Sequence, residues 1–146
     1  MCLLIEILVP GVQPTETSSL TREAAKLGLL ELSAQRDSRI AAGSRFLLTE
    51  PRQGCACSLL GENADWDLPH YDLDPAHSAV LESTLRFVAA HAGPSGFALR
   101  AAWLDGAFEN AKTASVRAVQ LTDLINDVRA AKIANNVRYE VSGTAA

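Results

Sequence analysis

A helix whose two ends are both marked in the sequence most constrains how this chain can fold. Asp74 occupies the N-cap position, Pro75 is the first helical residue, and Gly93 followed by Pro94 ends the helix. One face of this helix consists of Val80, Leu81, Thr84, Leu85 and Val88. An amphipathic helix of this kind must pack its apolar face on a sheet or on another helix.

Short segments of alternating apolar and polar residues predict the strands of such a sheet. The first segment, residues 2–9, is apolar on most of both faces, as in a buried central strand. The other predicted strands span residues 29–35, 45–49, 55–60, 97–103, 116–121 and 137–141. Because several of these strands follow one another directly, we expect mainly antiparallel pairing.

Two further helices complete the predicted pattern. One begins in the polar cluster at residues 15–18 and ends near Gly28. The other is expected to have Thr122 as its N-cap, and Asn135-Asn136 can end it in a left-handed turn. Its apolar face consists of Leu124, Ile125, Val128 and Ile133.

The element order β-α-β-β-β-α-β-β-α-β predicts an α+β fold. We expect a two-layer sandwich in which a mainly antiparallel sheet packs against three helices, in one domain that spans residues 1–146. The nearest simple topology is a ferredoxin-like core with added strands.

Negative charge is concentrated in one part of the chain. The formal net charge is −4, and residues 61–82 contain no Lys or Arg. The acids in that range are Glu62, Asp65, Asp67, Asp72, Asp74 and Glu82. An acidic chain disfavours binding to the phosphates of nucleic acid.

The apolar stretches and the cysteines indicate where the protein resides. No apolar stretch reaches the roughly 18 residues of a membrane helix. An odd number of cysteines suits a reducing compartment. We therefore expect a cytoplasmic protein without membrane contact.

Aromatic side chains lie within this acidic stretch, and they favour a binding role. The candidate binding residues are Asp65, Trp66, Asp67, His70, Tyr71 and Asp72. Acids beside aromatic residues suit a basic protein partner, a polyamine, an amine-bearing ligand or a second copy in a homodimer. A solvated loop is the alternative, since Asp72 and Asp74 stand at a helix N-terminus, where negative charge is favourable. The central glycine and terminal glutamate of a calcium loop are missing.

A thiol or metal site is the second candidate. Cys55, Cys57, His70 and His77 include the residue types of a zinc site, but the spacings within the cysteine pair and within the histidine pair do not fit. We expect Cys55, Cys57 and Leu59 to form the buried face of the strand at residues 55–60. The alternative is a thiol- or metal-dependent enzyme in which His70 and His77 assist a reactive Cys55 or Cys57.

No phosphate-binding glycine loop, Ser-His-Asp signature or histidine-glutamate zinc motif occurs in the chain. The leading hypothesis is therefore a small non-enzymatic binding domain that needs no cofactor. It would use the acidic residues and aromatic side chains of residues 61–74 to contact a basic partner or a second copy of itself.

Overall fold

The computed structural model describes residues 2–10, 17–35, 44–49, 56–61, 70–104 and 115–143. Six strands form one mixed sheet in the order β2-β3-β1-β5-β8-β6. They are β1 (Cys2–Val9), β2 (Glu31–Gln35), β3 (Ser44–Thr49), β5 (Phe97–Leu104), β6 (Ser115–Val119) and β8 (Val137–Val141). Neighbouring strands are antiparallel except β6 and β8, which are parallel and are joined through a helix.

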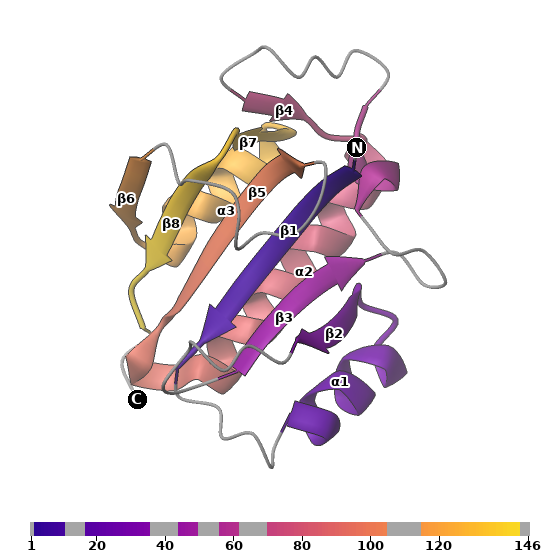
Figure 1. The fold of residues 1–146 in the computed structure, drawn as a ribbon, viewed down its shortest axis with the longest axis vertical. Helices are drawn as coiled ribbons and strands as arrows, with labels where there is room; N and C mark the ends of the chain where they lie inside the picture. The colour runs from indigo at the N-terminus through magenta and orange to yellow at the C-terminus, as the bar shows by residue number, and fades with distance from the viewer. Residues whose placement is uncertain are drawn as a thin grey trace.

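The helices are α1 (Thr17–Lys26), α2 (Pro75–Ala92) and α3 (Leu121–Arg129). Figure 1 shows α2 and α3 behind the sheet and α1 beside β2. The predicted α+β fold, with three helices and a mainly antiparallel sheet, is therefore confirmed. The ferredoxin-like core stays a prediction. No helix in the described ranges is both long enough and apolar enough to span a membrane.

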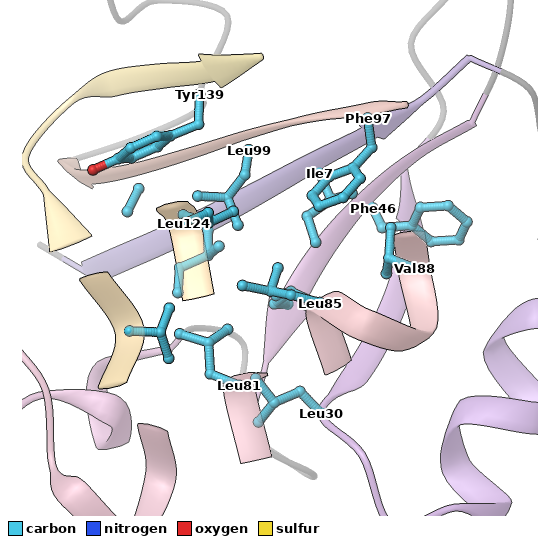
Figure 2. Packing of buried hydrophobic residues seen from close by; sticks show 14 of the residues in the cluster. Ile7, Leu30, Phe46, Leu81, Leu85, Val88, Phe97, Leu99, Leu124 and Tyr139 are labelled. Carbon is cyan, nitrogen blue, oxygen red and sulfur yellow. The ribbon is translucent and has the colours of Figure 1, made fainter. Parts of the chain in front are cut away.

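The core lies between the sheet and the helices. On β1, Leu3, Ile5 and Ile7 are fully buried and face the helices, whereas the alternate residues Leu4 and Leu8 are half-buried on the other face. This confirms the prediction of a central strand that is covered on most of both sides. Figure 2 shows side chains of β1, β5 and β8 pointing toward those of α2 and α3. Burying such side chains contributes about 1.5–3 kcal/mol each.

The ends of the first two helices follow the sequence signals. Asp74 caps α2 by accepting a hydrogen bond from the backbone N–H of Ala76 at 2.9 Å, and Gly93 is the C-cap with φ +58°. Gly28, with φ +68°, follows α1 and takes the left-handed conformation that glycine adopts without strain.

The predicted strand at residues 55–60 is wrong for the part that the structure describes. Cys57–Leu59 is a single turn of 3-10 helix, labelled η2. The ladder between β1 and β3 ends at Ile5, so the backbone of Leu3 needs other partners on that side. Ala56 N–H donates to the Leu3 carbonyl at 2.9 Å, and Leu3 N–H donates to Cys57 Sγ at 3.3 Å. These hydrogen bonds hold a turn beside the end of the ladder, where the sequence predicted a strand.

The predicted boundaries of α3 also need correction. Gln120, not Thr122, is the N-cap, because the Gln120 and Asp123 side chains form a reciprocal capping box. Ile133 is buried, but it lies in β7 (Lys132–Ala134) beyond the end of the helix. Ala131 has φ +58°, and this conformation turns the chain out of the helix.

Two strands of three residues were not predicted. β4 (His70–Asp72) pairs antiparallel with β7 and forms a second, two-stranded sheet. Figure 1 shows it at one end of the main sheet. It joins the end of the acidic stretch to the chain that follows α3.

Candidate binding surface

Backbone hydrogen bonds hold both ends of the acidic segment, defined as residues 61–74. Gly61 N–H donates to the Asp72 carbonyl at 2.9 Å, and Asp74 N–H donates to the Leu59 carbonyl at 2.8 Å. Leu73 N–H donates to the Ala131 carbonyl at 2.7 Å. The start and the end of the segment therefore meet beside the end of α3.

A cleft of about 540 Å³ lies where these ends meet. It is lined by Gly61, Asp72, Leu73, Asp74, Pro75, Ala130, Ala131 and Lys132. These residues come from four parts of the chain: the end of η2, β4 with the start of α2, the end of α3, and β7. Only three of them carry a charge, namely two aspartates and one lysine, so the lining is net negative.

The two aspartates of the cleft have different roles. Asp74 is committed to the N-terminus of α2, where its carboxylate accepts from Ala76 N–H and lies 3.8 Å from His77 Nδ1. This confirms the predicted helix-terminal role of Asp74. Asp72 is half-buried, and its backbone pairs with Lys132 across the small sheet. Asp72 therefore brings a second carboxylate to the cleft beside the N-cap Asp74.

The structure describes only part of the predicted binding set. Asp72 lines the cleft. The backbones of His70 and Tyr71 belong to β4, where they pair with Ala134 and Ile133, but the side chains of both lie outside the described part. The predicted binding residues Asp65, Trp66 and Asp67 also fall outside the described residues.

The thiol and metal candidates are likewise only partly described. Cys57 is half-buried, and its Sγ accepts the Leu3 N–H, which gives this sulfur a structural contact. His77 lies in the first turn of α2 beside Asp74. Cys55 is outside the described residues. Among the described residues, no three His, Cys, Asp or Glu side chains gather as a metal site would require. The enzyme hypothesis stays a prediction.

A second charged cluster was missed at the sequence level. Glu6 on β1 projects from the sheet face opposite the helices and pairs with Arg45 of β3. Arg100 of β5 stands directly across from Glu6, and Arg138 of β8 stands directly across from Arg100. The signal that could have found it is that each residue occupies a polar-face position of its strand.

Burial and charge act in opposite directions on this arginine cluster. Burial lowers the pKa of Arg100, while the nearby Glu6 carboxylate raises it, and Arg45 and Arg138 lower it further. Arg45 and Arg100 are each 8% exposed. Glu6 is thus the carboxylate that offsets repulsion at the buried Arg45 and Arg100, whereas Arg138 also lies 3.7 Å from the exposed Glu140.

Comparisons with known proteins do not assign the chain: no family model, curated protein or solved structure matches it.

Proposed function

We propose that this chain is a non-enzymatic binding domain that recognises a basic protein partner through the acidic segment and the cleft at its base. The observation that carries the proposal is a cleft with a net negative lining at the base of a segment without Lys or Arg. Backbone hydrogen bonds hold both ends of this segment beside the cleft. A partner that carries Lys or Arg side chains would complement this charge.

The fixed ends support recognition because they reduce the conformational freedom that binding must remove. Four backbone groups at Leu59, Gly61, Asp72 and Asp74 are joined in pairs before any partner arrives. Ordering a backbone residue costs about 1–2 kcal/mol, so pre-ordered ends leave more of the interaction free energy as affinity. Trp66 and Tyr71 of the segment can add contacts to cationic groups.

The proposal includes a cytoplasmic location, which the cysteine composition favours. A homodimer, in which a second copy supplies the basic side chains, is the competing arrangement. The oligomeric state of the protein alone separates a foreign basic partner from a second copy.

The test measures binding of a hexa-arginine peptide by fluorescence anisotropy at about 50 mM salt and at about 500 mM salt. The variant Asp65→Asn/Asp67→Asn/Asp72→Asn removes three negative charges from the segment. We expect about tenfold weaker binding at low salt, because three charge pairs of roughly 0.5 kcal/mol each are lost. We also expect the affinity of the unaltered protein to fall at high salt.

The matched control is Glu23→Gln/Glu31→Gln/Glu140→Gln, which changes the net charge equally at exposed positions outside the segment. It should change the affinity less than twofold. Equal losses in the two triple variants would show that only net charge matters, and they would overturn the proposal. Sedimentation of the protein alone as a dimer that Asp72→Asn dissociates would support the second copy as partner instead.

A further inference from the structure

The outer edge of β6 is an unpaired edge of the main sheet among the described strands. Of these strands, only β8 pairs with β6, and the first four residues of β6 are exposed. At the other edge, α1 lies beside β2, and Thr21 Oγ1 donates to the Leu32 carbonyl at 3.0 Å (Figure 1). One edge of the sheet is therefore covered and the other is open among the described elements.

The pairing of β6 with β8 shows which backbone groups point outward. Ser142 N–H donates to the Val119 carbonyl at 3.0 Å, so Val119 turns its backbone groups toward β8. In a parallel pair, residues alternate between pointing toward the neighbour and pointing away from it. Arg117 therefore also faces β8, and Val116 and Ala118 direct their N–H and C=O groups away from it. Within the described residues these four groups have no hydrogen-bond partner.

The strand edge ends at Gln120. Gln120 N–H donates to Asp123 Oδ2 at 3.2 Å, and the Gln120 carbonyl accepts from Asp123 N–H at 3.1 Å. The available edge thus consists of two donors and two acceptors on Val116 and Ala118. Val116 is also 59% exposed, which is unusual for a large apolar side chain in this structure.

We propose that this edge binds an extended acidic peptide segment of a partner protein by β-strand addition. An antiparallel segment would exchange two hydrogen bonds with Val116 and two with Ala118. The peptide residue between those two pairs would then stand directly opposite Arg117, at a Cα separation of about 4.5 Å. A carboxylate at that peptide position is favoured by the exposed guanidinium.

The position of Arg117 argues for a foreign acidic strand and against a second copy of β6. Two β6 strands related by a twofold axis use all four outward groups only if Arg117 stands opposite its own counterpart, and like charges in that position are destabilising. The Arg117 guanidinium carbon lies 5.6 Å from the centre of the Tyr139 ring, so the charge is held on the helix side of the sheet. Apolar β-branched peptide residues suit the opposite side, where Val116 is exposed.

The first arm of the test is amide hydrogen exchange of the free protein by NMR. The amides of Val116 and Ala118 should exchange at least tenfold faster than those of Arg117 and Val119, which are bonded to β8. Equal protection of all four amides in the free protein would mean that the edge is already covered, and it would overturn the proposal.

The second arm titrates the labelled protein with the peptide Thr-Val-Glu-Val-Thr, blocked at both ends, and with its matched control Thr-Val-Lys-Val-Thr. The Glu peptide should bind about fivefold more tightly, since it replaces a like-charge pair with an opposite-charge pair. Arg117→Gln should reduce this preference to less than twofold, and Arg117→Glu should reverse it. Saturation should slow exchange at Val116 and Ala118 alone.

A third peptide carries N-methyl groups on both valines, and therefore lacks the two donors that strand addition requires. It should not bind. Equal binding of the methylated peptide, or equal affinity for the Glu and Lys peptides, would overturn the inference. Concentration-dependent dimerisation that protects Val116 and Ala118 without peptide would also overturn it, in favour of a second copy. None of these results depends on the acidic segment.

Discussion

Replacing Glu6 with Gln tests whether one carboxylate offsets the arginine cluster on the sheet. Glu6 pairs with Arg45, and the next strand places Arg100 directly opposite Glu6. Gln has nearly the same shape and keeps an acceptor oxygen for Arg45, so the substitution removes charge and little else. We expect Glu6→Gln to lower the free energy of unfolding by about 3 kcal/mol.

The expected loss of unfolding free energy follows from how deeply the Glu6–Arg45 ion pair is buried. The side chains of Glu6 and Arg45 are 14% and 8% exposed. Removing one partner of a buried ion pair costs roughly 3–5 kcal/mol, and the residual exposure of Glu6 together with the retained acceptor favours the low end. Burial already lowers the pKa of Arg100, and Glu6 opposes that change, so the variant should leave Arg100 less stable in its charged form.

The assay is urea unfolding followed by circular dichroism, with a thermal scan in parallel. For a chain of this length, 3 kcal/mol corresponds to a fall in Tm of roughly 6–12 °C. Glu140→Gln is the matched control, because Glu140 lies 3.7 Å from Arg138 on the same face but is 54% exposed. That change should cost under about 0.5 kcal/mol. Equal costs for the two variants would refute the argument that Glu6 stabilises a buried cationic cluster.

Two further perturbations test other contacts. Tyr139→Phe should cost about 1–2 kcal/mol, because the buried Tyr139 hydroxyl accepts from Ala134 N–H at 3.0 Å and contacts Asp127 at 3.5 Å. Burial also raises the pKa of Tyr139 above its ordinary value near 10, so its contribution is fully present below pH 10 and is lost as the pH rises through the folded-state pKa; urea titrations from pH 9 to 12 should show a loss that Tyr139→Phe lacks. Asp74→Ala should cost about 1 kcal/mol through loss of the bond from Ala76 N–H, whereas Asp74→Ser, which keeps a cap, should cost less than half of that in the same denaturant assay.

The elements predicted correctly are those whose signals are local. The helix from Pro75 to Ala92 has its cap, its proline and its terminal glycine within its own sequence. Strands β1 and β8 show period-two burial because each has one face on the core. The local sequence is enough to predict such segments, since neither the cap nor the alternation depends on distant residues.

The missed elements depend on partners far away in the sequence. β4 and β7 have three residues each, and each is a strand only because the other pairs with it. The turn at Cys57 depends on the unpaired end of β1, which in turn depends on where β3 stops. No local sequence pattern predicts these contacts. The cleft beside the acidic segment is formed by the same long-range pairings, so the sequence indicated the acidic residues but not the cleft.

The two proposed binding sites are separable because the chain distributes its charges unevenly. The acidic segment holds carboxylates without Lys or Arg, whereas Arg117 is the charged residue of β6 and directs the choice of an added strand. Removing the charge of Asp72 should therefore weaken the binding of cationic ligands and leave the binding of the acidic peptide unchanged. Removing the charge of Arg117 should have the opposite effect. Because both interactions are between opposite charges, both should weaken as salt rises. A single variant that abolished both would indicate loss of the fold, and only the crossed pattern supports two sites.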